Sequence, residues 1–329
     1  MTQAIRFSGN RIRAITFDGG GTVYPKGKEQ IRIHQEINDL LVKTAVSGAK
    51  LALISVNSSE VDLARVGYPL REALRPHQLA GQLACYVDGG ARLVTFDPEE
   101  KSDENYSKPF YIPEKAAARI RKAICQILPS QFGLNPEERI AWLDFYRERH
   151  PSARLPWLEG KMRRRAPLKY FPELTPTQAK NPPYAPWLEN RDNLMLAIKV
   201  LPRQPREVRD ETIRQIFRID PALQKTLRFN PGGFGSIDIL DKKAGKRAAL
   251  NHFMNSNHLA AEEVIYVGDE LTPDREDSDL LLPDFAQMPK IAVNSLQMPV
   301  AENIPNLFYD PLRTGPQGTA AWLSDILIA

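Results

Sequence analysis

The chain has 329 residues and a mass of 37.2 kDa, a length that favours two domains over one. Hydrophobic residues make up 42% and charged residues 26%, which is typical of a globular protein and excludes a wholly disordered chain. The net charge of +4 is too small to indicate nucleic-acid binding. No apolar run is long enough to span a bilayer, and the N-terminus lacks the apolar stretch of a secretory signal. Cys85 and Cys125 cannot form a disulfide framework, so we expect a cytoplasmic protein.

The first third of the chain alternates between strand-like and helix-like patterns. Residues 12–17 are a short apolar run with β-branched residues, and apolar residues recur at helical spacing over residues 30–47. Further apolar runs occupy residues 51–56 and 84–87, the latter followed by a glycine turn. Strands and helices in this order, joined by short connections, predict βαβ units and a parallel sheet.

The middle of the chain differs in composition from both ends. A polar segment begins after Phe96, and eight prolines fall within residues 147–190, a density that excludes a regular helix or central strand there. Alternating strand and helix patterns return near residue 235. We therefore predict an α/β core formed by residues 1–98 and 226–329, with an inserted α+β cap domain over residues 99–225.

A cluster of basic residues lies inside the proline-rich segment, beside four aromatic side chains. Its members are Lys161, Arg163, Arg164, Arg165 and Lys169. Such a cluster can hold an anionic substrate or a single-stranded nucleic acid. A solvated loop is the more ordinary interpretation, and we do not expect nucleic acid to be the partner.

Two aspartates directly follow predicted core strands. Asp18 follows the strand that ends at Phe17, and Asp269 follows Gly268 after the strand predicted over residues 263–267. Because the carboxyl ends of parallel strands meet at one edge of a sheet, the two carboxylates can converge there. Converging carboxylates suit Mg²⁺, and the glycines after Asp18 can direct backbone N–H groups at an anion. Each aspartate alone is more simply a turn residue, whereas the pair favours a metal-dependent site.

Four motifs in chain order resemble the haloacid dehalogenase-like (HAD) hydrolase superfamily. The residues that carry the resemblance are Asp18 in ITFDGGGT, Ser55 in LALISVN, Lys246 in AGKRAAL, and Asp269 with Asp277 in YVGDELTPDRED. The segment leading into Lys246 is similar to the phosphomannomutase and Cof-type branch, which inserts its cap between the second and third motifs. The resemblance implies a HAD-like Rossmannoid core with a parallel sheet and an inserted cap.

The resemblance also implies how a metal would be held. Asp18 would be the nucleophile, forming an aspartyl-phosphate, and would bind Mg²⁺ at the same time. The backbone carbonyl of Gly20 and the Asp269 carboxylate would be further ligands. Asp277 would support the metal waters or a neighbouring lysine.

The phosphate side of the implied site uses a second group of residues. Ser55 and Lys246 would bind the transferring phosphoryl oxygens, together with Gly19 and Asn57. The implied activity is that of a Mg²⁺-dependent phosphohydrolase acting on a small phosphorylated metabolite such as a sugar phosphate.

One position departs from the family pattern. Phosphatases and mutases of this family carry a second aspartate two residues after the nucleophile as general acid and base, and this chain has Gly20 there. General acid–base catalysis is typically worth about 10²–10⁴-fold, so we expect slow turnover unless another residue supplies the proton. The cap residues His150, Lys161 and Arg163 are candidates. The alternative is a catalytically degenerate HAD-like protein that binds a phosphorylated ligand or a protein partner.

Overall fold

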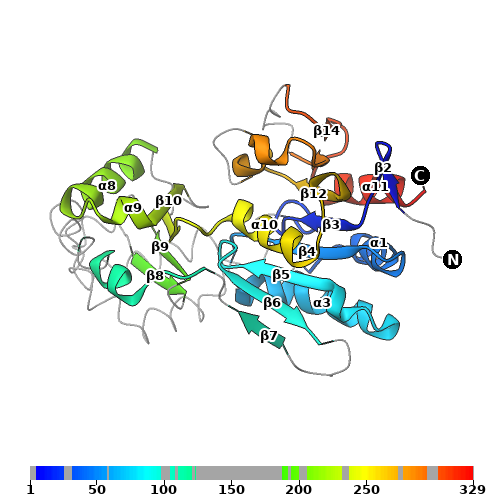
Figure 1. Cartoon of the computed structure of the whole chain (residues 1–329), viewed down its shortest axis with the longest axis horizontal. Coiled ribbons are helices and arrows are strands. Elements are labelled where there is room, and N and C mark those ends of the chain that lie inside the picture. The colour runs from blue at the N-terminus through cyan, green and yellow to red at the C-terminus, as the bar shows by residue number, and fades with distance from the viewer. Residues whose placement is uncertain are drawn as a thin grey trace, which may run out of the picture. The chain divides into compact units, whose positions relative to one another are not determined.

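The computed structural model divides the chain into two compact units, Met1–Pro109 with Ala244–Ala329 and Phe110–Lys243 (Figure 1). Each unit is described here by itself. The residues that the structure describes are 5–25, 32–57, 59–97, 104–107, 110–120, 123, 187–191, 194–199, 206–231, 237–272, 277–294 and 303–328.

An eight-stranded sheet forms the centre of the first unit, in the order β14-β13-β12-β3-β4-β5-β6-β7. All strand pairs from β14 to β5 are parallel, and β6 and β7 extend the sheet with antiparallel pairs. The bounds, in sheet order, are Leu307–Tyr309, Lys290–Ala292, Val264–Gly268, Ala14–Phe17, Lys50–Ile54, Leu83–Val87, Arg92–Phe96 and Glu104–Ser107. A short hairpin of β1 (Arg6–Phe7) and β2 (Asn10–Arg11) precedes it.

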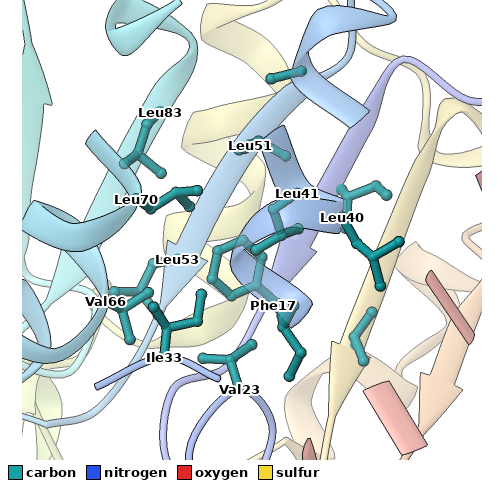
Figure 2. Packing of buried hydrophobic residues seen from close by; sticks show 14 of the residues in the cluster. Phe17, Val23, Ile33, Leu40, Leu41, Leu51, Leu53, Val66, Leu70 and Leu83 are labelled. Atoms are coloured by element: carbon teal, nitrogen blue, oxygen red, sulfur yellow. The ribbon is translucent and has the colours of Figure 1, made fainter. Parts of the chain in front are cut away.

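Helices pack on both faces of this sheet. Successive side chains of a strand point to opposite faces, so each central strand contributes apolar residues to both. Ile15 and Phe17 of β3 pack into one apolar cluster with α1 (Gln35–Val46), α3 (Tyr68–Leu74) and α11 (Gly315–Ile328) (Figure 2). Ala14, on the opposite face of the same strand, packs with α10 (Lys246–Ser256). The strand that leads to Asp18 is therefore buried on both sides, as a near-continuous apolar run predicts.

The second unit has its own sheet and its own core. Its antiparallel sheet has the order β10-β11-β9-β8, with bounds Leu227–Pro231, Ile237–Asp241, Met195–Lys199 and Trp187–Arg191. Helical residues 114–120, together with α8 (Arg206–Ile219) and α9 (Leu223–Thr226), contribute apolar side chains to the cluster on this sheet. An antiparallel sheet with helices on it is an α+β arrangement.

The predicted domain boundaries at residues 98 and 226 are wrong in position. β7, at Glu104–Ser107, lies after the first predicted boundary and yet pairs with β6 in the sheet of the first unit. β10 and β11 lie after the second predicted boundary and pair with each other and with β9 in the second unit. The composition shift after Phe96 placed the first boundary too early because β7 lies within that polar segment. The return of a strand pattern placed the second too early because a strand pattern does not indicate which sheet the strand joins.

A short helix, α2 (Ser59–Asp62), follows β4 and leads through one wider helical turn, Leu63–Gly67, into α3. Of the helices in the described ranges, none combines the length and the apolar composition that a bilayer span requires.

Candidate active site

Asp18 lies at the carboxyl end of β3, in the middle of the parallel sheet. Its backbone N–H donates to the Val267 carbonyl of the neighbouring β12 at 3.0 Å, which continues the strand pairing by one residue. Its side chain is 5% exposed, and its Oδ1 accepts the Gly19 N–H at 2.7 Å. The carboxylate is thus held at the carboxyl end of the parallel strands, where the sequence predicted it.

Lys246 is the cation beside this carboxylate. Lys246 is the first residue of α10, and its ammonium lies 2.8 Å from Asp18 Oδ2 and 2.6 Å from Asp277 Oδ1. All three side chains are buried, so solvent screens these ion pairs little. Three of the predicted site residues are therefore brought together by one ammonium group.

Asp277 has a further hydrogen bond within this cluster. The Tyr266 hydroxyl donates to Asp277 Oδ1 at 2.7 Å, and burial, helped by the Asp277 charge, raises the pKa of Tyr266. Gly268 makes room for this approach, because a Cβ at that position would lie 2.5 Å from Asp277 Oδ2. The glycine of the Gly-Asp motif is thus a steric requirement.

Asp269 follows β12 and is also 5% exposed. Its Oδ1 lies 3.4 Å from the hydroxyl of Thr22, which belongs to the loop after Asp18. The Thr22 contact links the loops that follow the two neighbouring strands, as the prediction of converging strand ends requires.

Ser55 and Asn57, predicted to bind phosphate, follow β4. Ser55 is fully buried, and its Oγ accepts the Asn57 N–H at 3.2 Å. The Asn57 side-chain amide points toward a tyrosine and an aspartate, donating to Tyr24 Oη at 3.1 Å and to Asp62 Oδ1 at 3.4 Å. Ser55 also donates a hydrogen bond to Asp62. Both residues thus contact the buried pair of Tyr24 and Asp62, which the sequence did not predict.

Tyr24 and Asp62 are the functional candidates that the sequence analysis missed. The Tyr24 hydroxyl donates to Asp62 Oδ1 at 2.6 Å, while Asp62 Oδ2 has no hydrogen-bond partner within the described residues. Asp62 is fully buried. Burial raises its pKa to about 6, and the Asp18 charge acts in the same direction, against hydrogen bonds from Ser55, Tyr24 and Asn57.

The first two of the three glycines after Asp18 lie against this cluster. A Cβ at Gly19 would lie 3.2 Å from both carboxylate oxygens of Asp62, so the absence of a side chain there accommodates the carboxylate. A Cβ at Gly20 would lie 3.4 Å from Tyr24 Oη, an ordinary contact distance. Gly20 and Tyr24 also form an isolated β-bridge.

Three predicted alternatives for a proton donor lie outside the described residues. They are His150, Lys161 and Arg163. The other residues of the basic cluster, Arg164, Arg165 and Lys169, also lie outside the described residues.

Comparison with known proteins places the fold. The sequence matches no family model and no curated protein. The structure matches a phosphatase of the haloalkanoate (HAD) enzyme superfamily from Bacteroides thetaiotaomicron with a TM-score of 0.58 and 12% identity, over 97% of this chain and 96% of that one. A protein from Streptococcus mutans matches with a TM-score of 0.58 and 14% identity, over 97% of this chain and 100% of the other.

An IMP-bound, N-terminally truncated IMP-nucleotidase from Plasmodium falciparum also matches. Its TM-score is 0.56 at 12% identity, over 97% of this chain and 68% of that chain. At such identities a match establishes the fold. The chain therefore has the fold of HAD-type phosphatases, which confirms the predicted fold class and, at the level of the fold, the predicted resemblance.

Proposed function

We propose that this protein is a Mg²⁺-dependent phosphohydrolase that acts on a small phosphorylated metabolite, such as a sugar phosphate, through an aspartyl-phosphate on Asp18. The observation that carries the proposal is the position of Asp18 at the end of the central strand, 2.8 Å from the ammonium of Lys246. A carboxylate held in this way can attack phosphorus while the ammonium offsets the charge of both the nucleophile and the phosphoryl oxygens.

The chemistry of the donor set fits Mg²⁺. Asp18, Asp269 and Asp277 contribute three buried carboxylates, and carboxylate oxygens are ligands that Mg²⁺ takes. Within the described residues no group of three acidic, histidine or cysteine side chains is arranged to hold a metal ion by itself. Asp18, Asp269 and the Gly20 carbonyl would hold the ion, supported by Asp277, and the bound ion would supply positive charge to the phosphoryl oxygens.

The second unit, Phe110–Lys243, would be the cap that selects the substrate. Its separate sheet and core support this assignment, because an inserted domain with its own core can be exchanged or elaborated without disturbing the site residues of the first unit. Ser55, Asn57 and the Gly19 N–H would contribute to phosphate binding on the core side.

Gly20 supports a second candidate function. Since glycine can neither donate nor accept the required proton, a protein with the nucleophile and the lysine but without acid–base help could bind a phosphorylated ligand, or a protein partner, without turning it over.

A panel of phosphate esters tests the two functions against each other. Wild type and Asp18→Asn are assayed with Mg²⁺ on sugar phosphates, IMP and 4-nitrophenyl phosphate, with phosphate release as the measurement. We expect turnover by the wild type, loss of turnover after chelation by EDTA, and loss in Asp18→Asn.

Binding measurements by calorimetry on the same compounds complete the test. Binding of a phosphate ester without turnover in the wild type would favour the degenerate binding protein. Turnover that persists in Asp18→Asn would contradict the assignment of the nucleophile.

A further inference from the structure

A turn of three left-handed residues follows β5, whose carboxyl end lies at the same end of the sheet as those of β4 and β3. The backbone φ angles are 53° at Asp88, 71° at Gly89 and 77° at Gly90. Glycine adopts this conformation freely, but it is uncommon for any other residue. Asp88 is also 1% exposed, so a carboxyl side chain is buried on a strained backbone. Such a residue persists only where its contacts fix it, and it is often part of a functional site.

Asp88 holds the segment that follows β4. Its backbone N–H donates to the Asn57 carbonyl at 2.8 Å, and its Oδ1 accepts the Ser59 N–H at 3.2 Å. Its Oδ2 accepts a hydrogen bond from Arg92 Nε at 2.7 Å, which directs the carboxylate. The same segment carries Ser55 and Asn57, the residues proposed to bind phosphate. Asp88 therefore fixes this segment through both its backbone and its side chain.

The last residue of the turn lies against the start of α10. A Cβ at Gly90 would lie 2.8 Å from the Gly245 carbonyl oxygen and 3.1 Å from Ala249 Cβ, closer than a side-chain carbon normally comes. Gly245 is the residue before α10, and its carbonyl accepts the Ala249 N–H at 3.0 Å. The first residue of that helix is Lys246. The turn thus packs directly on the backbone that precedes the proposed phosphate-binding lysine.

We propose that the turn of residues 88–90 sets the position of the two halves of the phosphate site relative to each other, with Asp88 as the positioning residue. The two halves are the segment after β4 and the start of α10, and the turn contacts both. The proposal rests on the proposed function, because it concerns how Ser55, Asn57 and Lys246 bind one phosphoryl group. Asp88 is buried and is hydrogen-bonded within the protein through both carboxylate oxygens, so it acts through the residues that it holds.

Phosphoryl transfer is sensitive to this placement. The reaction is accelerated mainly by positioning and electrostatics, and a displacement of about 1 Å can slow it by about 100-fold. The ion pairs with Asp18 and Asp277 fix the Lys246 ammonium beside the nucleophile. The turn extends this order to the segment after β4, which comes from a distant part of the sequence.

Two substitutions break the turn at its two contacts. Asp88→Gly removes the acceptor of the Ser59 N–H and introduces a residue that adopts the left-handed backbone freely. Gly90→Ala forces a methyl group against the Gly245 carbonyl. Gly48→Ala is the matched control, because Gly48 has a φ of 97° and a Cβ there would meet no described atom within 4 Å. The control thus adds backbone strain without pressing on either half of the site.

Asp88→Asn is the conservative variant. Asparagine tolerates the left-handed backbone and keeps a side-chain oxygen that can accept the Ser59 N–H. A role in positioning the segment after β4 requires this variant to keep most of the wild-type phosphate affinity.

The measurements are the affinity for inorganic phosphate in the presence of Mg²⁺, by calorimetry, and kcat and KM for the best sugar phosphate from the panel. They are made at a temperature at which thermal unfolding shows every variant to be folded. We expect Asp88→Gly and Gly90→Ala each to lose about 10- to 100-fold in phosphate affinity and in kcat/KM, and Gly48→Ala to match the wild type. The double variant of Asp88→Gly and Gly90→Ala should lose no more than the weaker single variant, because the two contacts act in series.

Other outcomes overturn the proposal. Wild-type phosphate affinity in Asp88→Gly and in Gly90→Ala, with turnover still dependent on Asp18, would reject the positioning role and leave the phosphohydrolase intact. Losses that add in the double variant, or an equal loss in Gly48→Ala, would show a general effect of destabilisation and would also reject it. A wild type that neither binds phosphate nor shows Asp18-dependent turnover would reject the proposed function and the positioning role together. If Asp88→Gly does not fold, the comparison of Gly90→Ala with Gly48→Ala decides the question.

Discussion

Two buried aspartates near Asp18 have similar tyrosine partners but different charged neighbours. Asp277 accepts the Tyr266 hydroxyl at 2.7 Å, and Asp62 accepts the Tyr24 hydroxyl at 2.6 Å. The Lys246 ammonium also lies 2.6 Å from Asp277 Oδ1. The groups that donate hydrogen bonds to Asp62, those of Ser55, Tyr24 and Asn57, are neutral.

The charged neighbours give the two carboxyl groups different surroundings. A buried carboxylate beside an ammonium can orient that lysine or support a metal ion. A buried carboxyl with neutral donors and a nearby negative charge has a raised pKa, as Asp62 has.

Removal of the Lys246 ammonium should have the largest effect. Lys246→Met leaves the buried Asp18 and Asp277 carboxylates without their shared cation, which we expect to lower the free energy of unfolding by about 3–5 kcal/mol. Phosphatase activity should fall by about 10²–10³-fold. Urea denaturation and initial rates at saturating Mg²⁺ measure the two effects.

Lys290→Met is the matched control for this prediction. Lys290 is also buried, but its ammonium donates to the backbone carbonyls of Phe285 at 2.6 Å and Met288 at 2.9 Å. We expect a loss of about 1–3 kcal/mol in stability, with activity unchanged. Equal effects of the two variants on activity would show that Lys246 acts only through stability.

The sequence predicted the residues around Lys246 and missed the buried pair of Tyr24 and Asp62. Asp18, Lys246, Asp269 and Asp277 follow strands or begin a helix within recognisable motifs, so their convergence follows from the order of the parallel strands. Tyr24 and Asp62 lie on a loop and a short helix, and neither spacing nor composition marks them. β3 and β4 are neighbouring parallel strands, so the segments that follow them lie close together, which is a tertiary effect.

The domain boundaries failed for a related reason. β7 lies in a polar segment without a strand pattern, and the apolar residues of β10 and β11 suit a strand of either sheet. Their pairing with β6 and with β9 is decided by long-range contacts, which local periodicity does not contain.

A pH dependence of stability should identify Asp62 as the group with the raised pKa. The folded state holds the Asp62 proton up to about pH 6, whereas the unfolded chain releases it near pH 3.8. Unfolding therefore releases a proton between about pH 4 and 6, and this group lowers the free energy of unfolding as the pH rises through that window. The contribution is on the order of 2–3 kcal/mol.

The comparison of wild type with Asp62→Asn isolates this contribution. The free energy of unfolding of the wild type minus that of the variant should fall between about pH 4 and 6 and stay constant above, because the other carboxyl groups cancel in the difference. Denaturation curves at half-unit pH intervals measure it. A difference that rises with pH over the same window would mean that Asp62 is stabilised as a carboxylate.

The smallest effects are expected from alanine substitutions at Gly268, next to Asp277, and at Gly20, next to Tyr24. A Cβ at Gly268 would lie 2.5 Å from Asp277 Oδ2 and 2.7 Å from the Tyr266 ring, whereas a Cβ at Gly20 would lie 3.4 Å from Tyr24. Gly268→Ala must displace two fully buried side chains, and we expect it to lower the free energy of unfolding by about 1–3 kcal/mol. Gly20→Ala should change it by less than about 1 kcal/mol.

Activity should follow the same order, because displacement of Asp277 also displaces the Lys246 ammonium that it holds at 2.6 Å. Gly268→Ala should therefore slow turnover of sugar and nitrophenyl phosphates equally, as a misplaced lysine affects the phosphoryl group common to both. Gly20→Ala adds a methyl group at an ordinary contact distance from Tyr24 and should slow both esters less than Gly268→Ala does. If Gly20→Ala slows them as much as Gly268→Ala, displacement of Asp277 is not the cause of the loss.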